Sequence, residues 1–135
     1  MTTNAPLPPY SKTRETDSLV FTSGHIGRDA AGHVKGGLEA QMDLALQNLE
    51  ESLSRHGLNR ADVVRTTVYL AEMADWERMN VPYRAFFDEP YPARSTVSVG
   101  LPTGLLVEID AIACKRPAGS SVETLAHAAS SEGAR

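Results

Sequence analysis

The chain has 135 residues, 41% of them hydrophobic and 22% charged, which is typical of one globular domain. Its formal net charge of −4 disfavours a partner held mainly through phosphate contacts, since such binding needs a clustered basic face. The single cysteine, Cys114, excludes an internal disulfide and favours a reducing compartment. No run approaches the ~20 apolar residues of a membrane span. The first residues lack a secretion leader, and we expect a cytoplasmic protein.

The first half of the chain predicts a strand followed by a helix. Residues 18–26 are rich in β-branched and aromatic side chains and indicate a strand. A turn-rich segment follows, with room for a short strand at residues 33–35. A helix begins at Leu38 and ends before Gly57, because its apolar residues recur at steps of three and four. These apolar residues are Leu38, Met42, Ala45, Leu46, Leu49 and Leu53.

The second half predicts a strand, a helix and two further strands. Residues 62–73 indicate a strong strand, and Asp75 is placed to cap the helix that follows it. The apolar face of that helix comprises Trp76, Met79, Tyr83 and Phe86. Pro82 lacks a backbone donor and predicts a kink or an interrupted first turn. The last two strands are expected at about 94–99 and 106–114. Residues 118–135 are small and polar, and we expect a disordered tail there after a domain of residues 1–117.

This order of elements predicts an α+β domain with two helices on one face of the sheet. Strand alternation places Val97 and Val99 on one side of their strand, and Arg94, Thr96 and Ser98 on the other. In the strand before the second helix, the more aliphatic side comprises Val64, Thr66, Val68 and Leu70. In the last strand it comprises Val107, Ile109, Ala111 and Ala113. The aliphatic sides suit packing against helices. The opposite sides mix apolar with charged groups, which predicts burial between subunits with a polar site at the interface.

Arg94 and Glu108 are the main candidates for chemistry. A guanidinium at the start of a strand can bind a carboxylate through two parallel hydrogen bonds, although a surface ion pair is the commoner role. Glu108 lies between Val107 and Ile109, so it either faces a cleft or needs a buried partner. A carboxylate with limited access to solvent can relay protons to and from water. The alternative is a structural ion pair with an arginine.

Three further positions are weaker candidates. Tyr10 follows two prolines and could close over a ligand, although such a tyrosine is more often a packing anchor. Ser23 and Gly24 end a strand and offer a hydroxyl and backbone amides near a turn. Asn80 in the second helix could brace a neighbouring loop.

Other kinds of site are not indicated by the sequence. The four histidines show no paired ligand spacing and Cys114 has no partner cysteine, so no metal site is expected. These histidines are His25, His33, His56 and His127. Neither a phosphate-binding glycine pattern nor the nucleophile elbow of serine hydrolases is present.

The chain resembles the RidA (YjgF) family over roughly residues 8–116. The resemblance is carried by "PPYSK", "LVFTSGHIGRD", "ALQNLEESLSRHG", "DVVRTTVYLAEMADWERMNVPY", "PARSTVSVGLP" and "VEIDAIA", in this order. It implies a chorismate-mutase-like α+β fold of the bacillus type, with a mixed β-sheet. It also implies a homotrimer with clefts at the subunit interfaces, and hydrolysis of reactive enamine or imine intermediates derived from amino acids.

The resemblance also implies roles for individual residues. Arg94 would bind the substrate carboxylate and Glu108 would position a water and shuttle a proton, with no cofactor because the C=N bond is already activated. Tyr10, Ser23 and Gly24 would contact the substrate. Asn80 would support the site, and Thr96 stands beside Arg94 where archetypal members carry cysteine.

Departures from the family pattern keep alternatives open. Residues 8–12 replace the usual Gly-Pro-Tyr-Ser-Gln, His25 stands where glutamine is common, and Pro82 interrupts Asn-x-x-Tyr. A subfamily with another substrate is therefore one alternative, such as a pathway-specific deaminase of an aminomuconate-like ring-cleavage product. A non-catalytic module that binds small carboxylates or a protein partner is another.

Overall fold

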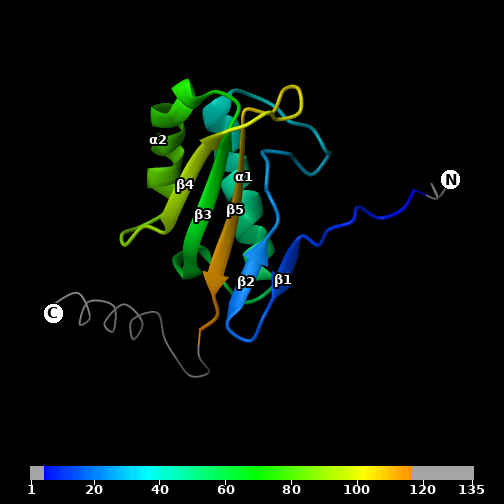
Figure 1. Ribbon diagram of the computed structural model, residues 1–135, viewed down its shortest axis with the longest axis vertical. Helices are drawn as coiled ribbons and strands as arrows, with labels where there is room; N and C mark the ends of the chain where they lie inside the picture. The colour runs from blue at the N-terminus through cyan, green and yellow to red at the C-terminus, as the bar shows by residue number, and fades with distance from the viewer. Residues whose placement is uncertain (1–4, 117–135) are drawn as a thin grey trace.

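The computed structural model describes residues 5–116 and shows a sheet backed by two helices (Figure 1). Its elements are β1 (Thr13–Glu15), β2 (Leu19–Thr22), α1 (Leu38–Ser54), β3 (Val63–Leu70), α2 (Trp76–Phe86), β4 (Ala93–Ser98) and β5 (Val107–Cys114), with short 3-10 helices at Arg60–Asp62 and Met73–Asp75. The tail predicted for residues 118–135 lies outside the described residues. Neither helix between residues 5 and 116 is long and apolar enough to cross a membrane.

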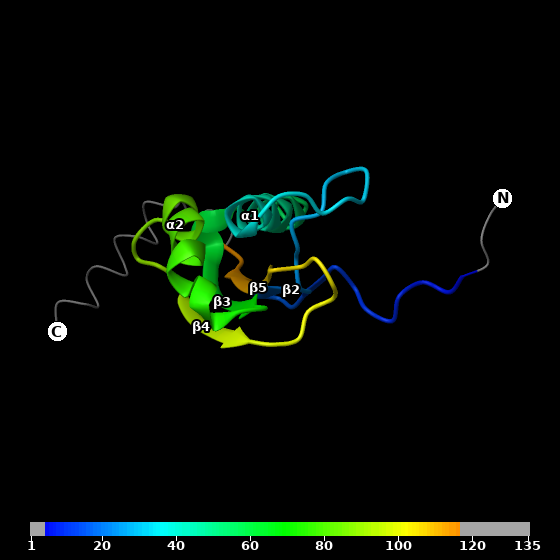
Figure 2. The same cartoon turned by 90° about the horizontal axis from the view of Figure 1, so that it is seen from above.

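The five strands form one mixed sheet in the order β1-β2-β5-β3-β4. β3 and β4 are parallel because α2 carries the chain back between them, whereas the other pairs are antiparallel. Figure 2 shows α1 and α2 on the same face of the sheet. This arrangement confirms the predicted α+β fold, and it leaves the other face without a helix from the described part of the chain.

The hydrophobic core lies between α1 and the centre of the sheet. The apolar residues of α1 predicted from the helical period are all buried, each at most 1% exposed. They pack over alternate residues of β5, which are equally inaccessible: Val107, Ile109, Ala111 and Ala113. The predicted aliphatic side of the last strand is therefore confirmed as the helix-facing side.

β3 departs from the alternation expected at its start. Its register with β5 shifts between Val63 and Arg65, which marks a β-bulge. Val63 is 7% exposed and joins the core, whereas Val64 is 48% exposed. The prediction that Val64 faces the helices is therefore wrong, because the extra residue of the bulge breaks the two-residue period.

The side chains of β4 point to the opposite faces of the sheet from those predicted. Arg94 pairs with Thr66 of β3, and Thr66 is fully buried beneath the helices. Arg94 and Thr96 therefore lie on the helix-facing side, whereas Val97 is 38% exposed on the other side. The cause is the place of β4 at the edge of the sheet. There α2 covers the strand incompletely. The space between α2 and β4 therefore holds the Arg94 guanidinium, where a fully covered strand would present valine.

Other differences concern the ends of elements early in the chain. β1 was not predicted, since its three residues have no hydrophobic alternation and are held by pairing with β2. β2 ends at Thr22, short of the predicted end at residue 26. The strand expected at 33–35 is reduced to a single bridge between Arg28 and Val34.

The entry into α2 also differs in detail. β3 ends at Leu70, and a 3-10 turn at Met73–Asp75 leads into the helix. Asp75 occupies the N-cap position, but its carboxylate accepts a hydrogen bond from Arg78 at 3.2 Å instead of capping the backbone. α2 continues through the buried Pro82 without a break, so the predicted interruption is absent.

Candidate functional site

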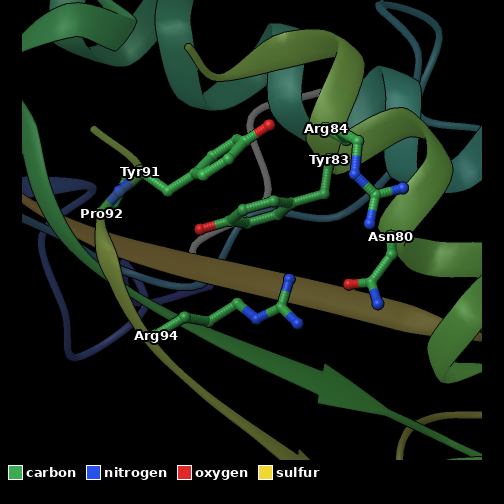
Figure 3. A pocket seen from close by; sticks show the side chains of 6 residues that line it. All are labelled: Asn80, Tyr83, Arg84, Tyr91, Pro92 and Arg94. Atoms are coloured by element: carbon green, nitrogen blue, oxygen red, sulfur yellow. The ribbon is translucent and has the colours of Figure 1, made fainter. Parts of the chain in front are cut away.

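A cavity of 260 Å³ opens between α2 and β4. Its lining residues come from α2, from β4 and from the segment between them: Asn80, Tyr83, Arg84, Tyr91, Pro92 and Arg94. Figure 3 shows the side chains of α2 approaching the Arg94 side chain from the opposite side of the cavity. The volume lies just below the ~300 Å³ at which pockets for drug-sized ligands begin, which suits a small metabolite.

Arg94 is held by aromatic rings rather than by an acid. Its guanidinium carbon lies 4.6 Å from the centre of the Tyr83 ring and 5.9 Å from that of Trp76. Among the described residues, the Arg94 side chain makes one weak hydrogen bond, from Nη1 to the Met79 sulfur at 3.8 Å. Within residues 5–116, Arg94 forms no ion pair with a carboxylate. The expected alternative, a structural ion pair, is therefore absent from the described chain, and the cation is available to bind an anion.

The residues around Arg94 are fixed by packing and by one buried hydrogen bond. The Tyr83 hydroxyl and the Thr66 hydroxyl lie 2.8 Å apart, which sets the Tyr83 ring beneath the guanidinium. Thr96, two residues along β4 from Arg94, has a buried hydroxyl with no hydrogen-bond partner in the described chain. An unpaired buried hydroxyl is unfavourable by about 1–3 kcal/mol, so a polar ligand atom there would be stabilising.

A second cluster lies on the other face of the sheet, around Glu108 of β5. The register partner of Glu108 on the neighbouring strand β3 is Tyr69. Glu108 alternates along β5 with the buried Val107 and Ile109, so its side chain points away from the helices. Gly24 passes directly over this side chain, and a Cβ at position 24 would overlap the Glu108 carboxylate. Any larger residue at position 24 would force the Glu108 carboxylate to move, so the glycine keeps this place open for the acid.

The surroundings of Glu108 favour its neutral form. Burial raises the pKa of the Glu108 carboxyl, and the negative charge of Asp110 on the same side of β5 raises it further. Asp110 in turn accepts a hydrogen bond of 2.7 Å from the Tyr69 hydroxyl. That bond, together with burial, raises the pKa of Tyr69 to about 12. A carboxyl with a raised pKa is a stronger proton acceptor than an ordinary carboxylate.

The loop that carries Gly24 is braced by a buried histidine. The His25 backbone exchanges hydrogen bonds of 2.7 and 3.0 Å with Ile109, next to Glu108. Its Nδ1 lies 2.8 Å from the Ser23 carbonyl and its Nε2 lies 2.7 Å from the Ser52 hydroxyl of α1. Since a carbonyl only accepts, Nδ1 carries the proton and Nε2 accepts from Ser52. Burial lowers the pKa of His25, which keeps the ring neutral.

Tyr10 belongs with this second cluster through its neighbours. The Ser23 hydroxyl donates to the Ser11 carbonyl at 2.6 Å, and the Ser23 amide donates to the Lys12 carbonyl at 2.9 Å. These bonds tie the Tyr10 segment to the loop before Gly24. The Tyr10 side chain itself is 69% exposed, so the single chain gives it no packing role.

The predicted site residues therefore form two groups on opposite faces of one sheet. Asn80 and Arg94 line the cavity under α2, and Thr96 joins this first group because it lies on the same side of β4 as Arg94. Tyr10, Ser23, Gly24 and Glu108 belong to the second. Within one chain, Arg94 and Glu108 do not meet.

Sequence reasoning missed four residues around Arg94: Trp76, Tyr83, Arg84 and Tyr91. A usable signal was present for two of them. Trp76, Asn80 and Tyr83 follow one another at steps of four and three, which places both aromatic rings on the helix face that carries Asn80. The apolar spacing of these rings indicates packing on the face of the helix and does not by itself indicate contact with a cation. Arg84 and Tyr91 gave no comparable signal.

The fold and the cavity place the chain among small α+β proteins of known structure. The YjgF gene product of E. coli matches with a TM-score of 0.76 and 35% identity, over 83% of this chain and 92% of that one. E. coli TdcF with bound serine matches with a TM-score of 0.76 and 34% identity, over 82% and 91%. The model of the family described as Endoribonuclease L-PSP matches residues 2–115. The chain belongs to this family, the RidA (YjgF) family.

Two curated relatives match this chain over most of their length. A mouse protein named 2-iminobutanoate/2-iminopropanoate deaminase is 40% identical over 121 residues, which cover 86% of this chain and 90% of the relative. A Salmonella typhimurium protein of the same name is 38% identical, over 85% and 95%.

Proposed function

We propose that the protein hydrolyses reactive enamine and imine intermediates of the 2-aminoacrylate type to 2-oxo acids and ammonia. The observation that carries the proposal is the Arg94 guanidinium, which faces a small cavity and has no acidic partner in residues 5–116. A planar cation in that position suits the carboxylate of a 2-imino acid. The names of the mouse and Salmonella relatives support the same chemistry.

The chemistry starts from the protonated imine and needs one water and three proton transfers. Arg94 would hold the substrate carboxylate and so fix the adjacent imine carbon. Glu108 would take a proton from a water molecule while the water oxygen bonds to the imine carbon, which gives a carbinolamine. The same carboxyl would return that proton to nitrogen, so that the C–N bond breaks and ammonia leaves. The Glu108 carboxylate would then take the hydroxyl proton of the carbinolamine carbon as the C=O bond of the 2-oxo acid forms. The raised pKa of Glu108 suits a group that must accept a proton and later donate it.

The proposal requires two copies of the chain at each site, since Arg94 and Glu108 lie on opposite faces of the sheet. We propose a homotrimer in which the Arg94 cavity of one subunit meets the Glu108 cluster of the next. Two different patches that meet in this way form a head-to-tail interface, which closes as a ring. Apolar side chains on the face without helices support such contact: Phe21, Val64 and Val97, which are 38–48% exposed.

The test is release of pyruvate and ammonia from 2-aminoacrylate generated in the assay. The wild-type protein should accelerate release, and Arg94→Ala should lower kcat/KM by about 100-fold or more, because a charged hydrogen-bonding partner of the substrate is lost. Arg55→Ala is a matched control, since Arg55 is an exposed arginine at the end of α1.

Two outcomes would contradict the proposal. Undiminished activity of Arg94→Ala would remove the role in carboxylate binding. Binding of 2-oxo acids without turnover of any imine would favour a non-catalytic binding module instead.

A further inference from the structure

The cavity contains a second guanidinium that the proposed reaction does not use. Arg84 of α2 lines the cavity together with Arg94, and none of the six lining residues is acidic. We infer that Arg84 binds a second acidic group, so that the preferred substrates are imines of dicarboxylic 2-oxo acids. This inference rests on the proposed function and names the substrate class for the same site.

The geometry places the two cations across the cavity from each other. Figure 3 shows the Arg84 guanidinium beside the Asn80 amide, on the side of the cavity formed by α2. Arg94 extends from β4 on the other side, and its guanidinium faces the Tyr83 ring of α2. A substrate carboxylate on Arg94 would therefore have its remaining carbon chain directed toward α2.

Arg84 has no acidic partner in the part of the chain that the structure describes, in contrast to Arg78 on the same helix. Arg78 donates to both carboxylate oxygens of Glu39 at 2.9 and 3.0 Å and also pairs with Asp75. Arg84 forms no ion pair with any residue between 5 and 116, and it is exposed to solvent where it lines the cavity. α2 therefore carries one neutralised arginine and one whose charge is directed to the cavity.

Charge balance distinguishes the two classes of substrate. A monocarboxylic imine neutralises Arg94 and leaves Arg84 uncompensated, whereas a second carboxylate would pair with Arg84. Arg84 is open to water, so its contribution is modest: about a tenfold preference, the size of one charge-assisted contact in a partly solvated position. The side-chain amide of Asn80 could donate a further hydrogen bond to the same group.

The test measures binding of two product-like acids by calorimetry. The wild-type protein should bind 2-oxoglutarate about tenfold more tightly than 2-oxobutanoate. Arg84→Ala should reduce that ratio to near one, whereas Arg84→Lys should retain part of it and Arg84→Glu should reverse it. Arg55→Ala is the matched control and should leave the ratio unchanged, since Arg55 pairs with Glu51 away from the cavity. Equal affinity for the two acids in the wild type, or an unchanged ratio in Arg84→Ala, would overturn the inference.

Kinetics separate failure of the inference from failure of the proposed function. The imines of glutamate and alanine can be formed in the assay by an amino-acid oxidase, and kcat/KM can be compared for both. Turnover of both with no dependence of their ratio on Arg84 would overturn the inference and support the function. Turnover of neither, with the binding ratio still dependent on Arg84, would contradict the function and support dicarboxylate recognition.

Discussion

Glu108 and Asp110 point to the same face of β5, and their closeness decides how Glu108 titrates. Burial and the charge of Asp110 both raise the pKa of Glu108. Asp110 is held in place by the Tyr69 hydroxyl at 2.7 Å. In the proposed reaction the ionised carboxylate receives the first proton, so activity should fall as the pH drops through this raised pKa.

Asp110→Asn should therefore move the acid limb of the pH profile. Removing the negative charge lowers the pKa of Glu108, so the carboxylate stays ionised to lower pH. The acid limb of the kcat/KM profile therefore shifts to lower pH. The asparagine oxygen can still accept the Tyr69 hydrogen bond. Asp43→Asn, at an exposed position of α1, serves as the control. An acid limb that stays at the same pH or shifts to higher pH would show that Asp110 does not raise the pKa of Glu108.

The residue types at the site could be predicted, but not their partners. Arg94 and Glu108 stand out in the sequence because each is a charge within a strand. The rings that hold Arg94 do not stand out, since aromatic residues on an amphipathic helix pack in the core more often than they bind a cation. Which ring faces the guanidinium depends on how α2 lies across β4, and local spacing does not determine that crossing.

At the scale of elements, His25 joins α1 to the loop that covers Glu108. Its neutral ring accepts from Ser52 of α1 and donates to Ser23, while its backbone pairs with Ile109. Burial lowers the pKa of His25. The stabilisation from this brace is therefore complete above the ordinary imidazole pKa of about 6.5, and it declines as the pH falls toward the lowered value in the folded state.

Ser52→Ala should lower the free energy of unfolding by about 1–2 kcal/mol at pH 7.5. The substitution leaves the buried Nε2 of His25 without its donor, and an unsatisfied buried acceptor is unfavourable by this amount. Urea denaturation measures the effect. Ser54→Ala is the matched control on the same helix, because its exposed hydroxyl bonds only to the Glu51 carbonyl within α1. Equal effects of the two substitutions would show that the brace contributes nothing.

The helices and strands could be predicted from the sequence where the spacing of apolar residues stayed regular along the whole element. The steps of three and four in α1 and the alternation in β5 both gave the correct buried side. The prediction was wrong where a local irregularity changed the period, as at the bulge beside Val63, or where an edge strand was only partly covered, as in β4. Neither a bulge nor a place at the sheet edge has a signature in hydrophobic pattern alone.

At the scale of the whole molecule, the two groups of site residues predict a specific behaviour of mixed oligomers. Arg94 lies on the helix-facing side of the sheet and Glu108 on the other side, so each proposed site combines them from neighbouring subunits. A subunit with a substitution at Arg94 still carries an intact Glu108, and a subunit with a substitution at Glu108 still carries an intact Arg94. Two inactive variants should therefore complement each other when their subunits are mixed.

Arg94→Ala and Glu108→Gln, unfolded together and refolded as a 1:1 mixture, should recover about a quarter of the wild-type activity. Each site needs an intact Arg94 from one neighbour and an intact Glu108 from the other, and random assembly supplies both in about one case in four. A mixture of Glu108→Gln with Gly24→Ala should recover none, because both changes lie in the same half and a Cβ at position 24 would displace the Glu108 carboxylate. Recovery in neither mixture would contradict a site shared between subunits, since a site contained within one chain cannot be restored by a partner.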